Sequence, residues 1–182
     1  MTHSNGTQES RSALPLPIQR IIEAVENVFG DDLKRIGHAF SVFRYAQELL
    51  RQESGDADVV LAAALLHDIG IHEAERKYGS SAGHYQEVEG PPIAATIMAD
   101  IGVDRSVIEH VCRIIGNHHS GKNIDTPEFR IIWDADWLVN IPDEFPGLDR
   151  TKLQGKIDRL FRTETGKMKA YRLYIDNEPD SM

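Results

Sequence analysis

The feature that most constrains this chain is an uninterrupted apolar run, Val59 to Leu66, that ends directly in His67 and Asp68. A helix that is apolar on every side has no face for solvent, so other helices must surround it. A carboxylate at the end of such a helix is costly to bury unless a cation or strong hydrogen-bond donors lie beside it. The run therefore predicts a central helix and a polar site at its end.

Helical spacing of apolar residues and helix-end signals continue on both sides of this run. Asp56 or Asp58 is expected to cap the central helix, because its side-chain oxygen can accept from a free backbone N–H. The segment from Ile71 to Val88 is polar and mixed, and we expect a short helix and a loop there. The further helices that we predict cover Leu16 to Phe29; Asp31 or Asp32 to about Gln52; Gly90-Pro91-Pro92 to Gly102; Val107 to Ile115, after a cap at Asp104; Thr126-Pro127-Glu128 through Leu138; and about Thr151 to Tyr174, weakened by Gly155 and Gly166.

This pattern predicts an all-α fold, a single-domain helical bundle. The 182 residues are enough for one compact domain with a substantial core. No segment shows convincing β alternation, internal repetition or low complexity. We expect a disordered tail over residues 1–13, where polar residues prevail, and one helical domain over residues 14–176.

The net charge of −9 excludes the partners that need a basic surface. Nucleic-acid polymers and anionic membranes both attract basic faces, so we expect neither as a partner. No apolar run approaches the roughly 20 residues of a membrane helix. The amino terminus has no basic-then-apolar signal pattern and Cys112 is the single cysteine, so we expect a cytoplasmic protein without disulfides.

Two residues far from the His67-Asp68 pair give it a chemical context. His38 lies on the apolar stripe of the expected helix upstream, and Asp136 lies on an expected helix downstream. A histidine, a later His-Asp pair and a distant aspartate resemble the pattern of the HD superfamily of metal-dependent phosphohydrolases. The fragment Leu65-Leu66-His67-Asp68-Ile69-Gly70 after an alanine-rich helix strengthens the resemblance, which covers about Asp31 to Asn140.

The resemblance implies a divalent metal ion held by His38, His67, Asp68 and Asp136. Imidazole and carboxylate together suit Mn, Fe, Co, Ni or Zn, and Mg where oxygen ligands dominate. Asp134 competes with Asp136 for the last position. The Ala-Asp-x-Leu stretch around Asp136 resembles one in several branches of the superfamily, so Asp136 is favoured, and Asp134 is expected to support the site or cap a neighbouring group.

His118 and His119 resemble the extra histidines with which some HD enzymes hold a second metal ion. Those enzymes place another histidine near the start of the fourth helix, where this chain has Gln86-Glu87-Val88-Glu89-Gly90. A glutamate could replace that histidine, or the second site could be absent, so one or two ions per chain are expected. The Gly-Tyr-Pro motif is absent after His119, which disfavours hydrolysis of cyclic dinucleotides.

The implied reaction is hydrolysis of a phosphate ester in a nucleotide or another small phosphorylated metabolite. Asp68 is expected to orient the attacking water as well as to bind metal, and Glu89 or Glu87 to act as the base. The side chains expected to hold the substrate phosphate are Arg35, Lys77, Lys122 and Arg130.

Three alternatives stay open at this point. Helical HD-like di-iron sites also support oxygenase chemistry, and a retained metal site could serve a non-catalytic module that senses a nucleotide. A structural bundle with coincidental His and Asp residues is the third alternative. The apolar residues from Tyr171 to Ile175 could pack against a second copy, so we allow for a homodimer.

Overall fold

The structure is a computed structural model that describes residues 13–178 and residue 180. The tail expected over residues 1–13 lies, apart from Ala13, outside these described residues. No strand occurs in the described part of the chain, so the predicted all-α class is confirmed. Its helices are α2 (Leu16–Phe29), α3 (Leu33–Leu50), α4 (Ala57–Leu66), α5 (Ile71–Tyr78), α6 (Gly83–Ile101), α7 (Arg105–Ile115), α8 (Pro127–Glu144), α9 (Arg150–Leu160) and α10 (Glu164–Tyr174).

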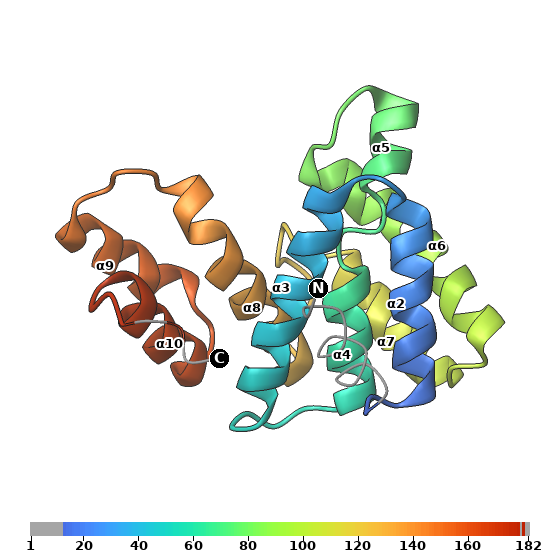
Figure 1. Cartoon of the computed structure of the whole chain (residues 1–182), viewed down its shortest axis with the longest axis horizontal. Coiled ribbons are helices and arrows are strands. Elements are labelled where there is room, and N and C mark those ends of the chain that lie inside the picture. Colours follow the sequence, from blue (N-terminus) through green and yellow to red (C-terminus); the bar gives the residue numbers. More distant parts are fainter. Residues whose placement is uncertain (1–12, 179, 181–182) are drawn as a thin grey trace, which may run out of the picture.

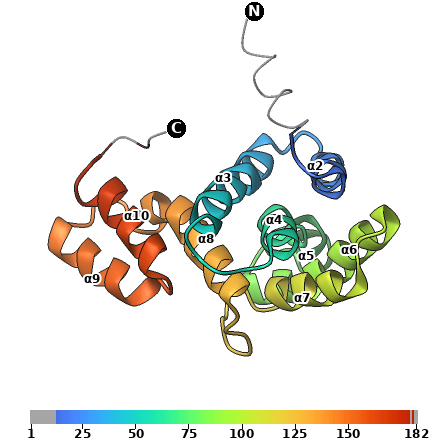
Figure 2. The same cartoon turned by 90° about the horizontal axis from the view of Figure 1, so that it is seen from below.

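Helix α4 is the central element, as its apolar composition predicts. Every residue from Val59 to Leu66 is buried, and α2, α3, α7 and α8 all pack against the helix (Figure 2). Burial of each large aliphatic side chain contributes roughly 1.5–3 kcal/mol, so α4 adds substantially to the stability of the core. Asp56 caps α4 by accepting from the backbone N–H groups of Asp58 and Val59. His67 and Asp68 follow directly at its buried carboxyl end.

Helices α3 and α8 pack on α4 and on each other, and their predicted starts are confirmed. Asp32 caps α3 by accepting from the Arg35 N–H at 3.1 Å, and Thr126 caps α8 by accepting from the Phe129 N–H at 3.3 Å. Local capping thus fixes where both helices begin. None of the described helices is long and apolar enough to cross a membrane.

Helix α6 begins at Gly83, so the expected start at Gly90-Pro91-Pro92 is wrong, and both prolines lie inside the helix. Proline removes a helical N–H donor and disfavours the helix interior. A tertiary contact offsets this cost: a Cβ on Gly70 would lie 2.6 Å from the backbone nitrogen of Gly90 and 2.9 Å from the Gln86 carbonyl oxygen. The first half of α6 therefore packs backbone to backbone against the turn that follows Asp68.

The single helix expected from Thr151 to Tyr174 is also wrong, because it is divided into α9 and α10. The break lies at neither expected glycine. The buried carboxylate of Asp134 on α8 accepts from the backbone N–H groups of Arg162 and Thr163, both at 2.8 Å, and from the Thr163 hydroxyl at 2.7 Å. Thr163 in turn caps α10. The two helices form a hairpin at the end of the molecule away from α2 and α6, with α10 packed on α8 (Figure 1).

Candidate metal centre

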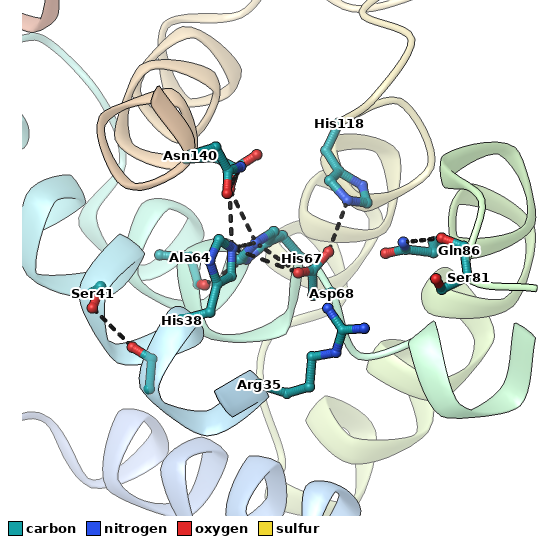
Figure 3. A network of polar contacts seen from close by, with 12 residues as sticks. Arg35, His38, Ser41, Ala64, His67, Asp68, Ser81, Gln86, His118 and Asn140 are labelled. Atoms are coloured by element: carbon teal, nitrogen blue, oxygen red, sulfur yellow. Dashed lines mark hydrogen bonds and ion pairs between the residues drawn. The ribbon is translucent and has the colours of Figure 1, made fainter. Parts of the chain in front are cut away.

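Four side chains from three helical segments converge at the carboxyl end of α4. The Nε2 atom of His38 on α3 lies 3.2 Å from His67 Nε2 and 3.6 Å from Asp68 Oδ2 (Figure 3). It also lies 3.1 Å from Oδ1 of Asp136 on α8. His67 Nε2 lies 3.5 Å from Asp68 Oδ2 and 3.7 Å from Asp136 Oδ1. The four residues that the resemblance singled out therefore share one small volume.

Backbone carbonyls fix the orientation of two histidine rings. His67 Nδ1 lies 2.9 Å from the Ala64 carbonyl oxygen, and His118 Nδ1 lies 2.7 Å from the Ile115 carbonyl oxygen. Because a carbonyl oxygen can only accept, Nδ1 carries the proton in each ring. The Nε2 atom of each ring then faces the carboxylates. A histidine ligand held through its other nitrogen is the usual arrangement at protein metal sites.

The chemistry of this donor set fits a divalent cation. Unprotonated imidazole nitrogens and carboxylate oxygens point their lone pairs into the same space, and only a positive charge makes that arrangement favourable. Ligand atoms of His38, His67 and Asp68 all lie within 4.8 Å of one another. Mixed nitrogen and oxygen donors of this kind are typical of sites for first-row transition metals.

Asp68 also belongs to a second group of donors. Ligand atoms of Asp68, His118 and His119 lie within 4.8 Å of one another, and His118 Nε2 is 3.3 Å from Asp68 Oδ1. The two oxygens of Asp68 thus face different histidines, with Oδ2 toward His38 and His67 and Oδ1 toward His118. Two donor groups that share one carboxylate are compatible with one ion or with two. The number of ions per chain therefore stays a prediction.

Burial keeps two of the histidines neutral. It lowers the pKa of His67, and together with the charge of the nearby His118 it lowers the pKa of His119 to about 4. A neutral imidazole is the form that binds a metal ion, so both rings have the required protonation state at neutral pH.

The two aspartates remain ionised although they are largely buried. Burial acts to raise the pKa of Asp68, but the neighbouring His67 and the hydrogen bond with His118 outweigh it and lower that pKa. For Asp136 the hydrogen bond from His38 likewise outweighs burial and lowers the pKa. Burial also opposes a charge on His38, yet the same bond to Asp136 raises the pKa of the imidazole. The two ionised carboxylates therefore favour the binding of a cation between them and the histidines.

These donors lie at one side of a cleft of about 480 Å³. Arg35, which was expected to hold the substrate phosphate, lines the cleft, and the ion pairs of its guanidinium within the described residues are long, 3.9 Å to Asp32 and 3.7 Å to Glu75. Lys34 adds a second positive charge to the lining. The other lining residues are His38, Asp68, Ile71, Gln86, His118, His119, Trp133, Asp136, Trp137, Asn140, Asp143 and Glu144.

The structure does not bring Glu89 and Lys77 to this cleft. Lys77 Nζ lies 2.6 Å from Glu89 Oε2, and the Tyr78 hydroxyl donates to Glu89 Oε1 at 2.8 Å. Glu89 is buried beneath these partners and lines a separate groove between α5 and α6. Glu89 is not free to serve as a base at the candidate metal centre, and Lys77 is not free to bind phosphate there, because the two side chains form an ion pair with each other.

Three other predicted residues also lie apart from the cluster. Glu87 Oε1 accepts from the backbone N–H groups of His119 and Ser120 at 3.0 and 2.7 Å, so it holds the turn after α7. Arg130 is paired with Asp125 at the surface, and Lys122 is exposed on the loop before α8 without lining the cleft.

Asp134 and Asp136 point in different directions from α8. Asp134 is fully buried, faces the turn between α9 and α10, and has its pKa raised to about 6 by burial. Of the two, Asp136 faces the histidines, and its role as a metal ligand stays a prediction. Asn140 was not predicted: it donates from Nδ2 to Asp136 Oδ1 at 2.8 Å. Its spacing of one helical turn from Asp136 is a signal that the sequence does contain.

Comparison with known proteins identifies the same part of the chain. The HD domain family model matches residues 35–141, a span that includes every donor from His38 to Asp136. Among solved structures, the chain is similar to the crystal structure of a predicted HD superfamily hydrolase from an uncultured Thermotogales bacterium. The TM-score is 0.66 and the sequence identity 25%, over 94% of each chain. No curated protein matches the sequence.

Proposed function

Because the chain belongs to the HD domain family, we propose that it is a metal-dependent phosphohydrolase acting on a nucleotide or another small phosphorylated metabolite. One observation carries the proposal: His38, His67, Asp68 and Asp136 converge in a cleft that also presents Arg35. The solved structure similar to this chain is itself described as a predicted hydrolase, which supports the reaction type.

The four converging residues are the proposed ligands of a divalent ion, from among Mn, Fe, Co, Ni and Mg. Such an ion lowers the pKa of a bound water and polarises a phosphoryl oxygen. The chain supplies the orientation: the Ala64 carbonyl holds the His67 ring, and Asn140 holds the carboxylate of Asp136. Residues of this supporting kind matter nearly as much for affinity as the ligands do.

Substrate binding is proposed to rest on the cations of α3. The Arg35 guanidinium can donate two parallel hydrogen bonds to phosphoryl oxygens, and its present ion pairs are long enough to exchange for them. Lys34 makes no ion pair with another described residue and can add a second charge. Of the carboxylates predicted to be catalytic, Asp68 lines the cleft and Glu87 and Glu89 do not, which supports Asp68 as the group that takes a proton from a reacting water.

The shared carboxylate of Asp68 supports a second candidate function. A carboxylate between two groups of histidines suits a pair of iron ions, and such a pair supports oxygenase chemistry. Oxygen consumption by the iron-loaded protein, with polyols and phosphonates as trial substrates, separates this function from hydrolysis.

The test of the proposed function compares the wild-type protein with His67→Ala/Asp68→Ala. Metal content is measured by elemental analysis, and phosphate release from nucleotides and sugar phosphates is measured with added Mn, Co, Ni or Mg. We expect one or two ions per chain and phosphate release in the wild type, and the loss of both in the double variant. His72→Ala is the control, since His72 also lies beside an aspartate, 3.2 Å from Asp32, but outside the cleft.

Either of two results would contradict the proposal. The first is a wild-type protein that holds no metal even after reconstitution. The second is phosphate release that survives in the double variant at the wild-type rate.

A further inference from the structure

Gln86 on α6 is a buried polar residue in the wall of the cleft, and the mechanism above does not use it. The residue is 6% exposed, and its amide nitrogen donates to the Ser81 carbonyl oxygen at 2.6 Å. Its Oε1 atom is buried and has no hydrogen-bond donor within reach among the described residues. A buried carbonyl oxygen without a donor costs free energy, so we expect this atom to accept a hydrogen bond from a bound molecule.

The contact with Ser81 determines which end of the amide faces the cleft. The Ser81 carbonyl can only accept, so it must face the amide NH₂ of Gln86 and cannot face Oε1. Figure 3 shows the amide nitrogen directed toward Ser81, and Gln86 lines the same cleft as Asp68 and His118. Gln86 therefore offers the cleft an acceptor and no donor.

The partner of Gln86 Oε1 must be a small donor. Phosphoryl oxygens are themselves acceptors, so the atom does not bind the phosphate group. Oε1 is buried, so a bulky substrate group cannot reach it. A water molecule is the smallest donor, and a slight rotation of the Gln86 side chain toward the cleft that it lines would bring Oε1 within reach of one. Water is the usual partner of buried polar groups that lack a protein donor.

The position of Gln86 relates this water to the reaction. Gln86 and Asn140 lie on opposite sides of Asp68 (Figure 3). The lining on the α8 side is large and provides room for the body of a substrate: Trp133, Trp137, Asn140, Asp143 and Glu144. Phosphoryl transfer requires the attacking and leaving oxygens to be roughly in line through phosphorus. A leaving group that lies along α8 therefore places the attacking water on the side of Gln86.

We propose that Gln86 is a positioning residue whose Oε1 accepts a hydrogen bond from the water that attacks phosphorus. This inference rests on the proposed phosphohydrolase function. In the reaction the water oxygen bonds to phosphorus and the bond from phosphorus to the leaving oxygen breaks. One proton of the water passes through Asp68 to the leaving oxygen. The other proton stays on the new phosphoryl oxygen. This second proton is the one that Gln86 Oε1 accepts as a hydrogen bond.

The test uses two variants. Gln86→Met keeps the length of the side chain and removes the acceptor. Gln86→Glu, in its protonated form, keeps both an acceptor oxygen and a donor to the Ser81 carbonyl. Gln19→Met is a matched control. The Gln19 amide also donates to a backbone carbonyl five residues earlier, that of Leu14 at 2.8 Å, but Gln19 does not line the cleft. Adenosine 5′-monophosphate and p-nitrophenyl phosphate serve as substrates with Mn²⁺, and metal content is measured alongside.

We expect Gln86→Met to lower kcat by about tenfold to a hundredfold, the effect of losing one well-placed hydrogen bond in the transition state. KM and the metal content should stay within about twofold of the wild type, as expected when only the reacting water is affected. Gln86→Glu should recover most of kcat, and Gln19→Met should match the wild type. A residue with a purely structural role would not separate kcat from KM in this way.

Three results would overturn the role of Gln86 while leaving the proposed function intact. An unchanged kcat in Gln86→Met would assign Gln86 to structure alone. A higher KM with unchanged kcat would assign it to substrate binding, and a lower metal content would make it a ligand. A metal-loaded wild-type protein that releases no phosphate would instead contradict the proposed function, and the water role with it.

Discussion

Asn140 shows how a single side chain can set the affinity of the candidate metal centre. It donates to Asp136 Oδ1 at 2.8 Å, the same oxygen that lies 3.1 Å from His38 Nε2. Without this bond the carboxylate is free to rotate away from the histidines. We predict that Asn140→Ala weakens metal affinity by roughly tenfold to a hundredfold, as measured by competition with a chelator of known affinity.

Asn117→Ala is the matched control for this substitution. The Asn117 amide also donates four residues back, to the Arg113 carbonyl at 2.9 Å, and this bond reaches none of His38, His67, Asp68 and Asp136. Equal affinities in wild type and Asn140→Ala would show that Asp136 does not need the support, or that it is not a ligand.

The residues that the sequence predicted best are those whose position depends on one helix at a time. His67 and Asp68 had to lie at a buried helix end, since the apolar run before them leaves no other place. Glu89 and Lys77 were misplaced because each found an oppositely charged neighbour at 2.6 Å. A sequence shows which residues are charged but not which of them form ion pairs in the folded chain. Gln86 gave no signal at all, since a neutral amide becomes notable only when it is buried without a donor.

Helix boundaries were predictable where residues adjacent in sequence determine them, and not where contacts between different helices do. The starts at Asp56 and Thr126 were predictable, because in each case the capping side chain is adjacent in sequence to the helix it caps. The break before Thr163 depends on Asp134, which lies on a different helix and is far away in the sequence. The extension of α6 through two prolines likewise depends on a contact with Gly70. Tertiary contacts overrode local preference in both cases.

The attachment of α10 to α8 gives the chain a pH dependence of stability. The Tyr174 hydroxyl donates to the Leu138 carbonyl oxygen on α8. Burial, with the nearby Tyr45 and Asp180, raises the pKa of Tyr174 above its ordinary value of 10.0. The folded chain therefore binds this proton more tightly than the unfolded chain does. The contribution to stability is complete below about pH 10 and is lost as the pH rises further.

We predict that the wild-type protein loses stability faster than Tyr174→Phe as the pH rises above about 10. At neutral pH the variant should be less stable by about 0.5–1.5 kcal/mol, since it lacks the hydrogen bond to α8. Urea unfolding at several pH values measures both effects. Parallel pH profiles for the two proteins would show that Tyr174 is not held in its neutral form by the fold.

At the scale of the whole molecule, the candidate metal centre connects elements that are distant in the chain. Its proposed ligands come from α3, the end of α4 and α8, with His118 and His119 from the turn after α7. A ligand that binds only the folded chain stabilises it in proportion to the logarithm of its concentration over Kd. At a hundredfold excess over Kd this amounts to about 2.7 kcal/mol. For a chain of this size that corresponds to a rise in Tm of roughly 5 to 10 °C.

We therefore predict that a chelator lowers the Tm of the wild-type protein and that added Mn²⁺ restores it, as followed by thermal unfolding. His67→Ala/Asp68→Ala should show no such response, whereas His72→Ala should respond as the wild type does. His119→Ala separates one ion from two: with two ions it loses part of the rise in Tm, and with one ion held by His38, His67, Asp68 and Asp136 it keeps all of it. A wild-type Tm that is the same with chelator and with metal would show that no ion connects these helices.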